Sequence, residues 1–400
     1  MKVLVADKLE EEALAGLRAL PGVEVVSAPG VSRDELPGAL GGVNVLVVRS
    51  KEVSAQAMEA GTSLALVVRA GAGVNTIDVK AASARGVSVA NCPGKNAIAV
   101  AELAIGFMLA ADRRIPEANR SLREGRWEKS EFGKADGLYG KTVGIAGLGA
   151  IGRETALRAR ALGLKVHGWS RSLTEEQASD LGVTRHASLL SLARASEILS
   201  LHLALKPETR GVVDENILEA LPRGALLVNT ARAEVLDWDA VIRFVRDRGL
   251  RLATDVFPGE PEGGRGTYTH ELLGMAGVWG TPHIGASTAQ AQLAIAAETV
   301  RIVKAFLETG EAPNCVNVLA QAPARAQVVV RHRDRVGVLA SVLEVLKRHG
   351  INVGEMTNRL FAGGAAATAR IRLASRPEDG CMAELSALPD VLHAERIELG

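Results

Sequence analysis

The chain has 400 residues, 47% hydrophobic and 23% charged, and its 47 basic and 46 acidic residues leave a net charge of +1. This length suggests roughly two to three domains of about 150 residues each. The balanced charge argues against a basic surface for nucleic acid or for an anionic membrane. Its three cysteines are widely spaced, which argues against a disulfide framework or a structural zinc site and predicts a reducing, cytoplasmic compartment.

The first part of the chain alternates short apolar runs with helix-compatible segments. Residues 43–50, 64–73 and 87–94 are such runs, and each is followed by a turn. A second series starts at Lys141, and a continuous helical pattern spans residues 288–307. Apolar strands separated by helices predict parallel sheets covered on both faces. We therefore expect an α/β protein with two doubly wound, Rossmann-like parallel-sheet domains.

Residues 97–111 predict a helix that is apolar nearly all round. The segment carries Glu102 and is too short to cross a bilayer. Such a helix must be buried on most sides, either in a large core or between subunits.

The last part of the chain has a different pattern. Residues 309–325 are rich in Pro, Gly and small side chains and predict a linker, which we place at 313–325. The order β-α-β-β-α-β then follows over 326–400, which is typical of a ferredoxin-like domain.

A glycine motif follows the first strand of the second series and opens a helix. Gly147 permits the tight turn, Gly149 lets a pyrophosphate approach the backbone, and Gly152 lets the helix pack closely on the strand. The helix N-terminus adds free N–H groups for the phosphates. A turn used only for packing is the alternative, but both the strand and the helix are in place. We predict that the site also includes Ala150 and Ile151.

The next strand ends in Ser170 and Arg171, where this fingerprint normally has an acidic residue for the ribose. Ser170 removes a carboxylate that would repel a 2′-phosphate, and Arg171 offers a guanidinium to pair with it. The pair favours NADP over NAD, although Arg171 as a solvated loop residue is the alternative.

Three further polar residues each follow a predicted strand end. Arg232, Glu260 and His283 could therefore converge on one crevice. Oxidation of a secondary alcohol needs a base that works near neutral pH, and histidine fits this role when a carboxylate orients it. An arginine would bind a carboxylate substrate. A histidine taken alone is more often a surface or core residue, and we assign no role to His167, His186 or His202.

Taken together, these motifs identify a resemblance. The run 69–109, the glycine motif, VNTAR, DVFPGEP and TPHIGAST occur in the order found in D-isomer-specific 2-hydroxyacid dehydrogenases. The resemblance covers essentially the whole chain and implies that Arg232, Glu260 and His283 are catalytic. It also implies cofactor contacts near the nicotinamide at Asp255 and elsewhere at Thr230, Ala231, Gly285 and Ala286.

Two features resemble the phosphoglycerate branch of that family. The first is a substrate and phosphate clamp formed by Arg49, Ser50, Arg69 and Gly73, although the two arginines could be ordinary strand-end charges. The second is the tail, which resembles an ACT regulatory domain, with His332, Asp334 and Asn352 near effector positions. The resemblance implies a small phosphorylated substrate, an amino-acid effector and a homodimer or homotetramer built through the helix at 97–111, without metal, nucleic acid or membrane partners.

The implied domains are a discontinuous substrate domain (1–98 with 285–312), a dinucleotide domain (99–284), the linker and an ACT-like domain (326–400). Ala233 stands where the family usually has glycine, so we expect a slightly different local turn there. In the tail, Val336 replaces the usual proline and Asp334 stands where an asparagine occurs in serine-inhibited members, so an ACT domain blind to effectors stays open. One rival is an NADPH-dependent glyoxylate/hydroxypyruvate reductase. Another is a dinucleotide-sensing binding protein, against which the intact Arg232, Glu260 and His283 argue.

Overall fold

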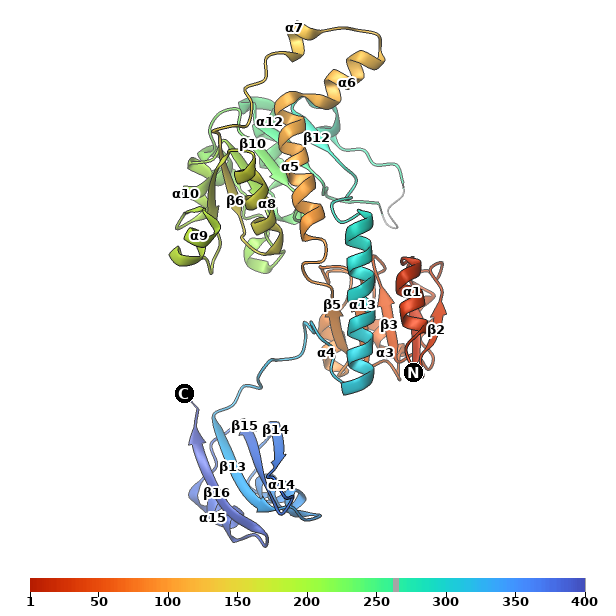
Figure 1. The fold of residues 1–400 in the computed structure, drawn as a ribbon, viewed down its shortest axis with the longest axis vertical. Helices are drawn as coiled ribbons and strands as arrows, with labels where there is room; N and C mark the ends of the chain where they lie inside the picture. Colours follow the sequence, from red (N-terminus) through yellow and green to blue (C-terminus); the bar gives the residue numbers. More distant parts are fainter. Residues whose placement is uncertain (262–265, 400) are drawn as a thin grey trace. The chain divides into compact units, whose positions relative to one another are not determined.

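The computed structural model describes residues 1–261 and 266–399, and the chain forms two compact units, 1–317 and 318–400 (Figure 1). The first unit holds two parallel sheets and the second holds one antiparallel sheet. No helix in the described part of the chain is long and apolar enough to cross a membrane.

The first parallel sheet has the strand order β2-β1-β3-β4-β5. Its strands are β1 (Lys2–Val5), β2 (Glu24–Ser27), β3 (Val45–Val48), β4 (Leu66–Arg69) and β5 (Ser88–Asn91). One face is covered by α1 (Glu11–Arg18) and α13 (Ala289–Thr309), and the other by α2 (Leu36–Ala39), α3 (Ala55–Ala60) and α4 (Val79–Ala84). Because both faces are covered, β3 is buried along its whole length.

The second parallel sheet has the order β12-β11-β10-β9-β6-β7-β8. Its strands are β6 (Thr142–Ala146), β7 (Lys165–Trp169), β8 (Thr184–Arg185), β9 (Ile198–Leu201), β10 (Leu226–Asn229), β11 (Arg251–Thr254) and β12 (Val278–Gly280). On one face lie α5 (Ala97–Arg113), α8 (Ala150–Ala161) and α9 (Glu175–Leu181), and on the other lie α10 (Leu189–Arg194), α11 (Glu215–Ala220) and α12 (Trp238–Arg248). The short helices α6 (Ile115–Arg123) and α7 (Lys129–Phe132) follow α5.

The chain passes twice between these sheets. Residues 92–96 lead from β5 into α5, and residues 281–288 lead from β12 into α13, whose Ile302 and Val303 are fully buried in the core of the first sheet. The long helix after the last strand of the second sheet therefore returns to the first sheet, as Figure 1 shows.

Part of the predicted linker is not free chain. Val316 N–H donates to Val89 O at 2.8 Å, and Asn317 Oδ1 accepts from Val89 N–H at 2.8 Å. The sequence suggested a linker here because the segment is rich in small residues, but β5 is an edge strand with backbone groups to satisfy. Residues 314–317 meet this need and belong to the first unit.

The second unit has the predicted β-α-β-β-α-β order: β13 (Ala326–Arg333), α14 (Val338–Arg348), β14 (Val353–Leu360), β15 (Ala366–Leu373), α15 (Asp379–Ala387) and β16 (Val391–Glu398). The sheet order is β14-β15-β13-β16, and all pairs are antiparallel. Both helices pack on one face, where Val330, Ile371 and Leu385 are fully buried. The predicted fold class is thus confirmed, with a ferredoxin-like arrangement in the second unit.

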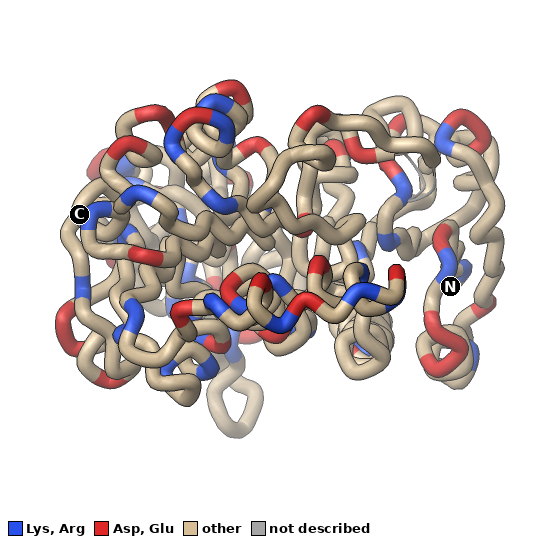
Figure 2. Tube along the Cα trace, turned by 90° about the horizontal axis from the view of Figure 1, so that it is seen from above, with Lys and Arg blue, Asp and Glu red and all other residues tan. Residues whose placement is uncertain are grey.

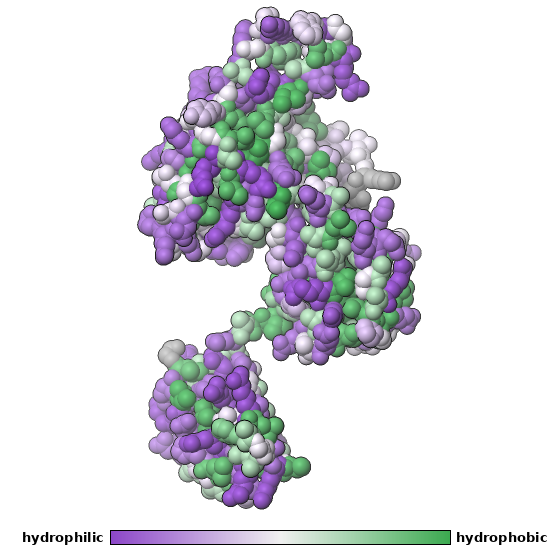
Figure 3. Space-filling view, viewed as in Figure 1, coloured by the Kyte–Doolittle hydropathy of each residue, from purple (hydrophilic) through white to green (hydrophobic). Residues whose placement is uncertain are grey.

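Charges and apolar side chains are distributed differently over the surface. Figure 2 shows basic and acidic residues interspersed along the chain, in line with the net charge of +1. Figure 3 shows apolar side chains at the surface around α5 and α8. Leu109 of α5 is 37% exposed and Leu157 of α8 is 56% exposed, although most of α5 is buried.

Candidate active site

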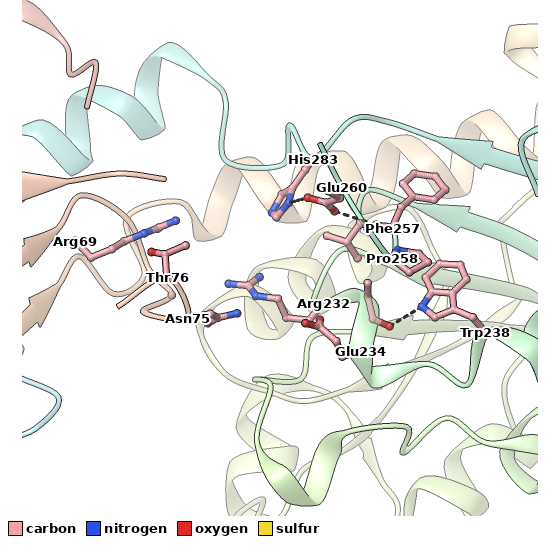
Figure 4. A pocket seen from close by; sticks show the side chains of 14 residues that line it. Arg69, Asn75, Thr76, Arg232, Glu234, Trp238, Phe257, Pro258, Glu260 and His283 are labelled. Atoms are coloured by element: carbon pink, nitrogen blue, oxygen red, sulfur yellow. Dashed lines mark hydrogen bonds and ion pairs between the residues drawn. The ribbon is translucent and has the colours of Figure 1, made fainter. Parts of the chain in front are cut away.

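A pocket of about 440 Å³ lies at the carboxyl ends of the parallel strands of the first unit. Arg69, at the end of β4, and the following loop line it from the first sheet. Arg232 follows β10, Glu260 follows β11 and His283 follows β12, and these three line it from the second sheet (Figure 4). The predicted convergence of these residues on one crevice is therefore what the structure shows.

Glu260 and His283 form a hydrogen-bonded pair. His283 Nδ1 lies 2.7 Å from Glu260 Oε2, and the Phe257 N–H donates to Glu260 Oε1 at 2.9 Å. Burial would raise the pKa of Glu260, but the hydrogen bonds from His283 and Phe257 and the charges of His283 and Arg232 outweigh it and hold the pKa below its usual value. Glu260 is thus ionised at neutral pH and orients the ring.

The loop that carries His283 is held by Asp255. His283 has a φ of 53°, a left-handed conformation that non-glycine residues adopt rarely. Asp255 is 2% exposed, its carboxylate accepts from the N–H groups of Ile284 and Gly285 at 2.8 Å each, and its backbone oxygen accepts from the His283 N–H at 2.9 Å. Burial raises the pKa of Asp255, and the hydrogen bonds offset part of this effect. The sequence predicted a cofactor contact for Asp255 but not this support of His283.

Two half-buried arginines, Arg69 and Arg232, line the same pocket. Burial lowers the pKa of Arg69 to about 10, and repulsion from Arg232 and Arg49 adds to this. Burial also lowers the pKa of Arg232. A Cβ at Gly73 would come within 2.5 Å of Arg232 Nη2, so glycine leaves room for this side chain. Like charges that repel each other in a pocket favour an anionic ligand with more than one negative charge.

Arg49 and Ser50 are not among the residues that line the pocket. Their loop is instead held by Asp7, whose Oδ2 accepts from the N–H groups of Arg49, Ser50 and Lys51 at 2.7, 3.0 and 2.9 Å. Because Arg49 acts electrostatically on Arg69, it contributes positive charge near the pocket, and a direct contact with substrate stays a prediction. Sequence reasoning did not identify Asp7 as the support of this loop. It also assigned no site role to the lining residues Asn75, Thr76, Glu234 and Trp238.

The glycine motif has the geometry that a dinucleotide requires. Gly147 has a φ of 97°, and a Cβ on Gly152 would lie 1.9 Å from Gly147 O, whereas the space over Gly149 is open. Ala150 and Ile151 form the first turn of α8. Thr230 follows β10, which lies two strands away from β6 in the sheet. Its Oγ1 is buried without a hydrogen-bond partner among the described residues. These residues fit a bound nicotinamide dinucleotide.

The other predicted cofactor residues lie at the ends of strands or in the His283 loop. Ser170 and Arg171 follow β7, where Arg171 is exposed. Ala231 is buried and its oxygen accepts from Arg232 Nη1 at 2.6 Å. Ala286 O accepts from Gln292 Nε2 at 2.7 Å. Their contacts with a cofactor remain predictions.

The predicted effector residues are placed differently from one another. His332 is 1% exposed, with Nε2 3.1 Å from Asn358 Oδ1 and Nδ1 2.9 Å from Arg333 O. Asp334 and Asn352 are exposed. Both ring nitrogens of His332 therefore have hydrogen-bond partners within the second unit. An effector site at these residues stays a prediction.

Several known proteins are similar to this chain in sequence and in fold. The profile of the D-isomer specific 2-hydroxyacid dehydrogenase, NAD binding domain, matches residues 105–285. A hydroxypyruvate reductase of Thermotoga maritima is 40% identical over 311 residues, which are 77% of this chain and 98% of that protein. The chain belongs to the D-isomer specific 2-hydroxyacid dehydrogenase family. The predicted family is thus confirmed.

Other members differ in name and in length. A D-3-phosphoglycerate dehydrogenase of Methanocaldococcus jannaschii is 37% identical over 80% of this chain, which spans only 60% of that relative's length. A crystal structure of an NADPH-dependent glyoxylate/hydroxypyruvate reductase of Sinorhizobium meliloti, in complex with NADP and malonate, has a TM-score of 0.69 at 29% identity and covers 79% of this chain and 96% of its own. Both NAD and NADP therefore occur as cofactors in this family.

Proposed function

We propose that the protein is a D-3-phosphoglycerate dehydrogenase, which moves a hydride between C2 of 3-phosphoglycerate and a nicotinamide cofactor in the first step of serine biosynthesis. The observation that carries the proposal is one pocket with two half-buried arginines, Arg69 and Arg232, beside the Glu260–His283 pair. The substrate carries a carboxylate and a phosphate, and two guanidinium groups match two anionic groups. The likeness to the Methanocaldococcus jannaschii enzyme supports this choice.

Each site residue has its own role in the proposed reaction. A bound nicotinamide supplies the hydride acceptor. His283 takes the proton of the C2 hydroxyl, and Glu260, ionised because its pKa is low, keeps Nδ1 bound so that Nε2 is available. Arg232 binds the carboxylate and the developing keto oxygen, and Arg69 binds the phosphate, with Arg49 adding charge.

The test compares initial rates for phosphohydroxypyruvate and hydroxypyruvate with NADH and NADPH. We expect a strong preference for the phosphorylated substrate, and we expect Arg69→Gln to raise its KM by about tenfold or more while hydroxypyruvate is hardly affected. Equal use of both substrates by the wild type would refute the proposal. No turnover of either would favour the dinucleotide-sensing alternative.

A second candidate is an NADPH-dependent glyoxylate/hydroxypyruvate reductase. It is favoured by Ser170 and Arg171 after β7 and by the likeness to the Thermotoga maritima hydroxypyruvate reductase over nearly its whole length. The variants Ser170→Asp and Arg171→Ala test the cofactor choice. If the pair binds a 2′-phosphate, each variant raises the KM for NADPH about tenfold and leaves the KM for NADH within about twofold.

Assembly and regulation are part of the proposal. We place the substrate domain at 1–98 with 285–312, the dinucleotide domain at 99–284 and an ACT-like regulatory domain in the second unit. A homodimer or homotetramer would cover the apolar surface around Leu109 and Leu157. Sedimentation of Leu157→Glu tests this, since a charge in that interface should yield a smaller species.

A further inference from the structure

Four rings gather beside the pocket in the second sheet. Trp238 stacks on Phe257 with centroids 6.2 Å apart, Phe257 meets Tyr268 at 5.6 Å, Tyr268 stacks on His270 at 6.2 Å, and His270 returns to Trp238 at 5.9 Å. These distances are within the range in which ring pairs attract each other. We name this closed set, Trp238, Phe257, Tyr268 and His270, the aromatic quartet.

The quartet stands out against the rest of the molecule. The chain contains 4 Trp, 2 Tyr and 6 Phe in 400 residues, and most of the residues in its cores are Val, Leu, Ile and Ala. The quartet uses one of the two tyrosines, whereas the other, Tyr139, is 88% exposed. Trp238 also packs against the core of the second sheet, but four rings in mutual contact beside the pocket are more than the aliphatic packing of that core accounts for.

The polar ends of Trp238 and Tyr268 each donate a hydrogen bond to a backbone oxygen close in sequence to Arg232 or Glu260. Trp238 Nε1 donates to Ala233 O at 2.9 Å, and Ala233 follows Arg232 directly. Tyr268 Oη donates to Pro258 O at 2.8 Å, two residues before Glu260. Figure 4 shows the indole of Trp238 pointing to the backbone oxygen of Ala233, with Phe257 and Pro258 beside the indole.

Phe257 joins these two contacts. Phe257 is 8% exposed, and its ring packs on β12, where a Cβ on Gly280 would come within 2.6 Å of Phe257 Cζ. Its N–H is the group that holds Glu260 Oε1. A shift of the Phe257 ring therefore moves the donor that holds Glu260, and through Glu260 it moves His283.

We propose that the aromatic quartet is a positioning unit that sets the distance between Arg232 and the Glu260–His283 pair. Its members act through the backbone of Ala233 and Pro258 and through the Phe257 N–H. The kinetic part of this inference rests on the proposed function, while its structural part, the hold on residues 257–260, does not.

Two rival explanations make different predictions. If the rings are packing only, removing one hydrogen bond lowers stability without changing the site. If Trp238, which lines the pocket, contacts the substrate itself, its variants change KM while residues 257–260 stay as they are. Under the positioning proposal, both the hold on residues 257–260 and kcat change, because a misplaced catalytic group slows the chemical step.

The test uses variants that keep a ring but remove one hydrogen bond. Tyr268→Phe removes the bond to Pro258, and Trp238→Phe removes the bond to Ala233. The matched controls are Tyr139→Phe and Trp127→Phe, whose parent side chains are 88% and 82% exposed. Amide hydrogen exchange is measured in the full chain on a peptide that covers 251–261, and kcat and KM are measured for the substrate that the wild type reduces.

We expect both quartet variants, and neither control, to speed exchange at residues 257–260 by about tenfold. We also expect kcat to fall by about tenfold to a hundredfold with the cofactor KM unchanged.

The outcomes separate the two levels of inference. Unchanged exchange, or changed exchange with the kinetics of the controls, overturns the positioning proposal. Wild-type protein without turnover overturns the proposed function instead, and the exchange of residues 257–260 then decides whether the quartet holds this segment.

Discussion

Glu298 of α13 provides a quantitative test of the electrostatics in the first unit. Glu298 is 5% exposed. Its carboxylate accepts from Arg301 Nε at 3.0 Å, Asn314 Nδ2 at 2.7 Å and Lys95 Nζ at 3.3 Å. The hydrogen bonds from Arg301 act most strongly, and together with Asn314 and Lys95 they outweigh burial and lower the pKa of Glu298 from 4.5 to about 2.

This shift sets the size and the pH dependence of the effect. Each pKa unit is worth 1.36 kcal/mol, so a fall from 4.5 to about 2 corresponds to about 3 kcal/mol of unfolding free energy at neutral pH. Because the folded-state pKa is the lower one, this stability is present above pH 4.5 and is lost as the pH falls toward 2. We expect Glu298→Gln to cost about 2 to 3 kcal/mol at pH 7, since Lys95 and Arg301 are partly exposed and can regain water.

The assay is urea unfolding followed by tryptophan fluorescence. All four tryptophans lie within 1–317, so the signal reports the first unit. Glu308→Gln is the matched control on the same helix, because Glu308 is 59% exposed and lies 3.9 Å from Lys304, a surface pair worth less than about 1 kcal/mol. A Glu298→Gln effect no larger than the control, or one that stays constant from pH 7 to pH 3, would refute the reasoning.

Three further predictions follow from the site and the glycine motif. Gly152→Ala should lower both the melting temperature and the affinity for dinucleotide, because the new Cβ would meet the Gly147 oxygen. Gly149→Ala should weaken dinucleotide binding but leave the melting temperature unchanged, because the space over Gly149 is open. Calorimetry and NADH titration distinguish the two variants. Glu260→Gln should lower kcat by about a hundredfold while the KM for the cofactor stays within about twofold, as steady-state rates would show, and an unchanged kcat would exclude the proposed orienting role. Burial lowers the pKa of His202 to about 3, so the unfolded chain takes up a proton below pH 6.5 that the folded chain does not, and stability should fall with pH below 6.5; His202→Asn should show a shallower fall in urea unfolding at pH 7, 6 and 5.

Much of the fold was predictable because its signals are local. The period of apolar residues marked most of the strands and helices, and the turn after each strand marked the ends where Arg232, Glu260 and His283 lie. The two-residue strand β8 is too short to show any period. The contacts of residues 314–317, within the linker predicted at 313–325, could not be foreseen for a different reason, since only the edge of β5 explains why these residues are bound.

The sequence by itself determined the chemistry at the strand ends, the glycine turn and the family, because each of these depends on residue types at short spacing. Only the tertiary structure decided which distant residues hold that chemistry in place. The Asp255 carboxylate holds Gly285 in the His283 loop from 30 positions away along the chain, and Asp7 holds the loop of Arg49. Trp238 at the start of α12 meets Phe257 in the loop after β11. Such pairs follow no period in the sequence, since their contact is created by the order of strands in the sheet and by the packing of the segments that follow them.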